Sequence, residues 1–111
     1  MSNENAKLFQ PIRVGNLELK HRIVMSPLTR YRADEAHVPT DIMVDYYSQR
    51  ASTPGTLLIT EATFIAARAG GSDHIPGIWS DAQVEGWKRV RMDLRVKDPP
   101  FGSTYCLPSR L

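Results

Sequence analysis

The chain has 111 residues, of which 41% are hydrophobic and 23% charged, and its formal net charge is only +2. This composition is typical of a soluble domain with one small core, and the scattered basic residues predict no binding to nucleic acid or to a membrane. A single cysteine, Cys106, excludes an internal disulfide. Because we find no apolar leader and no run long enough to cross a membrane, we expect a cytoplasmic protein.

Three short apolar segments follow the polar first residues. The segments 11–14 and 17–20 alternate apolar with polar residues around a Gly-Asn dipeptide, which suits a two-residue hairpin turn. The run 23–25 is wholly apolar and is closed by a Ser-Pro dipeptide. The sequence therefore predicts a hairpin and then a first strand that is buried on both faces.

A helix and a second strand are predicted next. From Asp41 to Ser52 apolar residues recur at helical spacing, with Thr40 placed as the N-cap. The continuous apolar run 56–60 is rich in strand formers and follows a Pro-Gly dipeptide, which predicts a strand covered on both faces. A strand, a helix and a strand in so short a span form a βαβ unit with a parallel crossover.

The stretch 66–77 contains Gly-Gly and Pro-Gly dipeptides and is predicted to be an irregular loop. A second helix should begin after Ser80, because the sequence Ser-Asp-Ala-Gln at 80–83 is a capping box. Its apolar stripe consists of Val84, Trp87, Val90 and Leu94.

The end of the chain carries no clear element signal. An Asp-Pro-Pro sequence at 98–100 stops the second helix, and the segment 101–111 has no periodicity, so we expect it to be irregular. Two strands with fully apolar faces need sheet neighbours on both sides, and a complete (β/α)₈ barrel takes about 250 residues. By pattern alone the chain is an incomplete α/β unit, the first part of something larger.

Several linked motifs resemble the opening of the old yellow enzymes of the fungal type. In order along the chain they are 8–16 (LFQPIRVGN), 21–30 (HRIVMSPLTR), 46–52 (YYSQRAS), 54–62 (PGTLLITEA), 69–71 (AGG), 76–80 (PGIWS) and 87–90 (WKRV). The resemblance implies that residues 1–90 are the N-terminal portion of an FMN-dependent oxidoreductase of TIM-barrel fold. That portion contains the closing hairpin and the first two βα units, and residues 91–111 are a divergent tail.

The resemblance also implies the chemistry and four site residues. In the family NAD(P)H reduces FMN, and the flavin passes hydride to an activated alkene, the small-molecule substrate. Pro27, Leu28 and Thr29 match the segment that lies against the flavin, and Thr29 matches the threonine whose hydroxyl bonds near O4 and N5 of the ring. Ala62 matches the small residue after strand two, where the backbone approaches the flavin. Without the resemblance, Thr29 would be interpreted as bonding its own loop backbone, and Ala62 as a residue that merely fills a helix or a loop.

Beyond Val90 the sequence departs from the family. The third strand with its flavin-contacting glutamine, the substrate-anchoring pair, the proton-donating tyrosine and the flavin-phosphate site have no match. Two alternatives to an enzyme therefore stay open: a non-catalytic product of a truncated or frameshifted gene, and a small α/β interaction module. No specific protein partner is predicted.

Other polar residues are given structural roles. Glu61 and Arg30 are interpreted as members of structural ion pairs near the barrel mouth in preference to catalytic groups. The three histidines lack metal-ligand spacing with one another or with Cys106, so no metal site is predicted.

Overall fold

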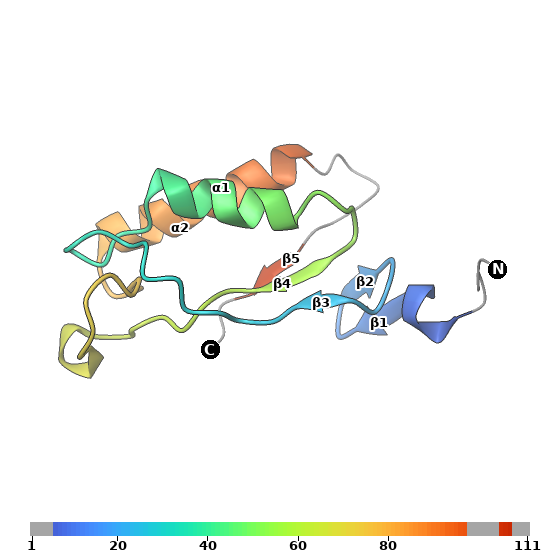
Figure 1. Cartoon of the computed structure of the whole chain (residues 1–111), viewed down its shortest axis with the longest axis horizontal. Coiled ribbons are helices and arrows are strands. Elements are labelled where there is room, and N and C mark those ends of the chain that lie inside the picture. The colour runs from blue at the N-terminus through green and yellow to red at the C-terminus, as the bar shows by residue number, and fades with distance from the viewer. Residues whose placement is uncertain (1–5, 98–104, 108–111) are drawn as a thin grey trace.

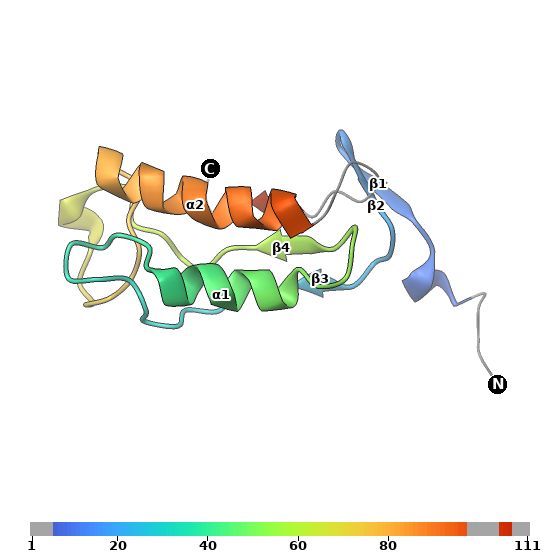
Figure 2. The same ribbon diagram turned by 90° about the horizontal axis from the view of Figure 1, so that it is seen from above.

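The computed structural model describes residues 6–97 and 105–107, which form a hairpin and a helix-covered parallel sheet. In chain order the elements are η1 (Lys7–Phe9), β1 (Ile12–Val14), β2 (Leu17–Leu19), β3 (Val24–Met25), α1 (Asp41–Arg50), β4 (Leu57–Ile59), η2 (Ala67–Ala69), α2 (Asp81–Lys97) and β5 (Tyr105–Leu107). Strands β1 and β2 form one sheet, and β3, β4 and β5 form a second sheet in that order. Both helices lie on one face of the second sheet (Figure 1), side by side when seen from above (Figure 2).

The hairpin forms as predicted. Strands β1 and β2 are antiparallel, and Val14 pairs with Leu17 across a turn of two residues. Of these two, Gly15 has a positive φ of 58°, a conformation that costs glycine nothing and that a type II′ turn requires at its first position. The hairpin lies beyond the N-terminal end of β3, opposite the loops that follow β3 and β4 (Figure 1).

The predicted βαβ unit is also present. Strands β3 and β4 are parallel, with Val24 opposite Leu57 and Met25 opposite Leu58, and α1 makes the connection between them. The three parallel strands form an open sheet, and the part of the chain that the structure describes contains no closed barrel. None of its helices is long and apolar enough to cross a membrane.

Strand β3 is less buried than its sequence predicts, whereas β4 agrees with the prediction. Leu57 and Leu58 are buried, because β4 is the central strand and has a neighbour on each side. Ile23 and Val24 are 48% and 39% exposed, because β3 is the edge strand and the helices cover only the face on which Met25 packs. The prediction that strand one is buried on both faces is therefore wrong for this chain.

The core lies between the helices and the sheet. It consists of the buried residues Ala33, Met43, Tyr47, Ala51, Leu58 and Val90, and Trp87 and Met25 pack against it. Helix α1 places its buried residues Met43 and Tyr47 four positions apart, which is the spacing of one helix face. Burial of this apolar surface is the main favourable contribution to folding, at about 25 cal/mol per Å².

The two helix starts differ in how they are capped. Thr40 occupies the N-cap position of α1, but its hydroxyl donates to the Arg32 carbonyl at 2.6 Å and makes no bond to the helix. At α2 the capping box is confirmed, because the amide of Gln83 bonds the hydroxyl of Ser80 at 3.3 Å and the Gln83 side chain accepts from the Ser80 amide at 3.1 Å. The loop before α1 competes for the Thr40 hydroxyl, whereas among the described residues no such competitor bonds the Ser80 hydroxyl.

The described part of the tail contains an element that the sequence did not predict. Strand β5 pairs in parallel with β4, with Leu57 opposite Tyr105 and Ile59 opposite Leu107. Three residues are too few for an alternating pattern to stand out, so a strand this short depends on its neighbour. Helix α2 continues beyond Val90 and ends at Lys97.

Candidate active site

The four site residues suggested by the sequence lie at one end of the parallel sheet. Pro27, Leu28 and Thr29 follow β3, and Ala62 follows β4. Because β3 and β4 are parallel and hydrogen-bonded neighbours, the segments that follow them leave the sheet at the same edge. This is the carboxyl edge of the strands, where (β/α)₈ barrels hold their active sites.

Most of these side chains are open to the outside. Pro27, Leu28 and Ala62 are exposed, and Thr29 is half-buried. Among the residues that the structure describes, none forms a hydrogen bond with the Thr29 hydroxyl, so the alternative of a bond to its own loop is not observed. The Thr29 side chain is therefore half-buried and the Ala62 side chain is exposed, in segments that follow neighbouring strands.

Directly behind this edge lies a buried carboxyl group, that of Glu61, which is only 1% exposed. Its Oε1 accepts a hydrogen bond from the Tyr47 hydroxyl at 3.1 Å, and its Oε2 accepts from the backbone N–H of Arg30 at 3.4 Å. The Tyr47 hydroxyl also accepts from the backbone N–H of Glu61 at 3.0 Å. Burial raises the pKa of the Glu61 carboxyl above its ordinary value, and the bonds from Arg30 and Tyr47 partly oppose this rise.

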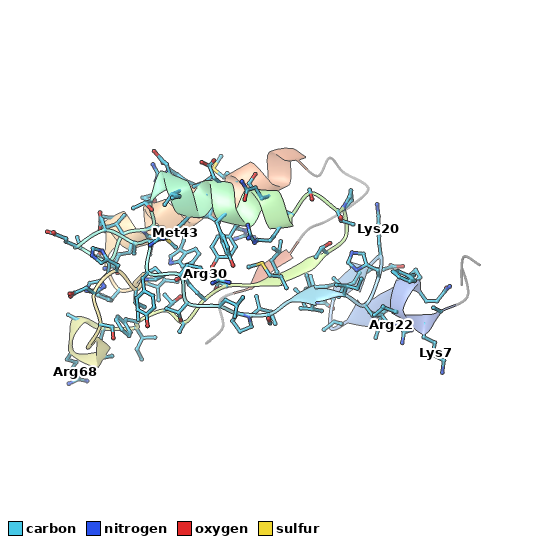
Figure 3. All side chains as sticks on the ribbon, viewed as in Figure 1. Lys7, Lys20, Arg22, Arg30, Met43 and Arg68 are labelled. Atoms are coloured by element: carbon cyan, nitrogen blue, oxygen red, sulfur yellow. The ribbon has the colours of Figure 1, made fainter. Side chains whose placement is uncertain are left out.

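The side chain of Arg30 is directed mainly to a tyrosine. Its Nε donates to the hydroxyl of Tyr46 at 3.1 Å, and its guanidinium lies 5.7 Å from the centroid of that ring. Arg50 stacks on the same ring at 3.8 Å. Arg30 lies beneath helix α1, which carries Met43 (Figure 3), and these residues line a cavity of about 390 Å³. Arg30 bonds Glu61 through its backbone N–H, and its positive charge also opposes the rise in the pKa of the Glu61 carboxyl.

Sequence reasoning identified the positions of Thr29 and Ala62 but not the link between Glu61 and Tyr47. The sequence places Glu61 directly after a continuous apolar strand but does not show that it is buried, and only a buried carboxyl group must find partners. Its partners come from segments 14 and 31 residues away, and one sequence does not reveal which segments these are.

The histidines have structural partners. His21 lies 2.9 Å from the hydroxyl of Thr56, and the rings of His37 and His74 contact the carbonyl groups of Ile75 and Ala33. Within residues 6–97 and 105–107, no group of three or more His, Cys, Asp or Glu side chains could hold a metal ion.

Comparison with known proteins agrees with the family resemblance found in the sequence motifs. A model of the NADH:flavin oxidoreductase / NADH oxidase family matches residues 7–98. Chanoclavine-I aldehyde reductase fgaOx3 of Penicillium roqueforti is 64% identical over 91 residues, which are 82% of this chain and 25% of that protein. The NADP-dependent oxidoreductase lnbE of Aspergillus flavus is 56% identical over 85 residues, 77% of this chain and 22% of that protein.

A comparison with solved structures gives the same family. The crystal structure of Old Yellow Enzyme from Pichia sp. AKU4542 superposes with a TM-score of 0.85 and 43% identity, over 94% of this chain and 26% of that one. The chain thus spans about a quarter of the length of the relatives that it matches. The match of the family model to most of the chain, with high identity to its members, shows that this chain belongs to the NADH:flavin oxidoreductase / NADH oxidase family.

Proposed function

We propose that this chain supplies the first two flavin-contacting strand ends of an FMN-dependent ene-reductase. The observation that carries the proposal is the common position of Thr29 and Ala62 at the carboxyl edge of two hydrogen-bonded parallel strands. Membership of a flavin oxidoreductase family supports FMN as the ligand of that edge. In the complete barrel, bound FMN would take hydride from NAD(P)H and deliver it to an activated alkene.

Each residue of this chain has a distinct task in that proposal. Pro27 and Leu28 offer exposed apolar surface to the ring, and the single methyl group of Ala62 lets the backbone come close. With FMN bound, the Thr29 hydroxyl would donate a hydrogen bond to the polar edge of the ring. A fixed donor there stabilises the negative charge that builds on the ring more strongly than it stabilises the neutral ring.

A hybrid protein tests the proposal. Residues 7–98 of this chain replace the matched segment of the Penicillium roqueforti reductase, so that the remaining three quarters of the barrel come from an established relative. We expect the hybrid to purify with one FMN per chain and to oxidise NADPH in the presence of cyclohexenone, an activated alkene. The unmodified reductase is the control. A folded hybrid without flavin would contradict the proposal.

Replacing Thr29 with Ala in the hybrid should change flavin reactivity and leave the fold intact. Because one hydrogen bond to the reduced ring is lost, at about 1.5 to 3 kcal/mol for a charged acceptor, the reduction potential should fall. Reduction by NADPH should slow roughly tenfold or more. Stopped-flow measurement of both half-reactions and a redox titration check this.

Thr29→Ser is the matched control, because it keeps the hydroxyl and loses only a methyl group. It should retain most of the reductive rate. Unchanged potential and unchanged half-reactions in Thr29→Ala would remove Thr29 from the catalytic residues.

A further inference from the structure

The two segments proposed to contact the flavin are joined by one side chain. The Oε2 atom of Glu61 accepts a hydrogen bond from the amide of Arg30, the residue that follows Thr29. Glu61 itself directly precedes Ala62. Glu61 therefore belongs to the segment after β4, and its carboxyl group bonds the segment after β3.

Tyr47 holds this side chain in place. Its hydroxyl is bonded twice to Glu61, as donor to Oε1 at 3.1 Å and as acceptor from the backbone N–H at 3.0 Å. These two bonds fix both the main chain and the side chain of Glu61. The carboxyl group thus cannot change its position without breaking at least one bond at the Tyr47 oxygen.

Tyr47 is itself firmly seated in the core. Its side chain is fully buried, and its ring contacts those of Tyr46 and Trp87, with centroid separations of 5.2 and 6.1 Å. A fully buried ring enclosed by two other aromatic rings has little space to change its rotamer, so Tyr47 is a firm anchor on α1. The core between helices and sheet is thereby connected to the edge that carries Thr29 and Ala62.

We propose that Glu61 and Tyr47 are positioning residues, which set the separation of the Thr29 and Ala62 segments and so determine how tightly and at what potential the flavin is held. The inference rests on the function proposed above. Sites of this kind need their contacting groups held within about 0.5 Å, and buried supporting hydrogen bonds provide that precision. Neither residue touches the ring; both act through the segments that do.

If Glu61 and Tyr47 only stabilised the fold, the expected results would differ. Loss of a buried hydrogen bond lowers the melting temperature wherever it lies, but the flavin bound to the remaining folded molecules would then keep its affinity and its potential. A positioning role changes both properties in protein that is fully folded. The two roles are therefore distinguished by measurements on the flavin.

The test compares two neighbouring tyrosines in the FMN-loaded hybrid. Tyr47→Phe removes the hydroxyl that is bonded twice to Glu61, whereas Tyr46→Phe removes a hydroxyl bonded to the Arg30 side chain. Tyr47→Phe should weaken FMN binding roughly tenfold, the equivalent of about one hydrogen bond, and shift the reduction potential. It should also speed hydrogen exchange at the amides of Arg30 and Glu61. Tyr46→Phe should leave FMN affinity within about twofold of the hybrid.

Glu61→Gln is the second variant, because it keeps the shape of the side chain and loses one acceptor. It should bind FMN with an affinity between those of the hybrid and Glu61→Ala. If Tyr47→Phe does not fold, the order of these three FMN affinities tests whether Glu61 positions the flavin-contacting segments. Equal FMN affinity and equal potential in the hybrid, Tyr47→Phe and Glu61→Gln would overturn the inference. Absence of flavin from the unmodified hybrid would instead count against the proposed function.

Discussion

A chain of these 111 residues, expressed alone and desalted, is expected to carry no bound FMN. Two strand ends contribute the proposed contacts, and Pro27, Leu28 and Ala62 are exposed at that edge. A barrel binds the phosphate of such a cofactor mainly with the loops after strands seven and eight, which lie outside the quarter of the fold that this chain matches. Without that charged anchor, contacts to the ring have to offset the full entropy of association.

Absorbance between 350 and 500 nm, about where oxidised flavins absorb, checks this expectation after gel filtration in the presence of FMN. The hybrid that contains residues 7–98 serves as the positive control, since it has the same strand ends and a complete barrel. A stoichiometric flavin band in the isolated chain would mean that the ring contacts alone suffice. It would also weaken the alternative of a non-catalytic gene product.

The elements that the sequence predicts correctly are those determined by neighbouring residues. The hairpin depends on Gly15, and the start of α2 depends on Ser80 and Gln83, three residues apart. The elements that differ depend on distant groups. The hydroxyl of Thr40 bonds the carbonyl of Arg32, and the exposure of β3 follows from its place at the sheet edge, neither of which is visible in a local pattern.

In the candidate site, too, the features that local motifs indicate were predicted, and those that depend on distant residues were not. Motif order placed Thr29 and Ala62 after consecutive strands, and the parallel pairing of β3 with β4 puts both at one edge. The residues that support this edge were not predicted, because the bonds of Glu61 to Arg30 and Tyr47 join three segments. Periodicity identifies Tyr47 only as a core residue, and its hydroxyl acquires a role when the helix packs on the sheet.

The isolated chain is also expected to aggregate or to fold only loosely. Within the described residues, β3 has β4 as its single strand neighbour, and Ile23 and Val24 leave apolar surface open on the uncovered face. An apolar strand with an unpaired edge is a template for pairing with other chains. Light scattering and thermal unfolding check this, and a monomeric, cooperative transition would contradict it.

Two substitutions on β3 distinguish the effect of the exposed face of the strand from the effect of its core-facing side. Val24→Lys places a charge on the exposed face, so it should raise the monomeric fraction of the isolated chain and keep its helical circular dichroism. Met25→Lys should abolish the helical signal, because Met25 packs against the core. In the hybrid the effect of Val24→Lys should reverse: the face away from the helices becomes the barrel interior, and a buried, unpaired ammonium group should prevent folding. A flavin-loaded Val24→Lys hybrid would show that this face of β3 does not line the barrel interior.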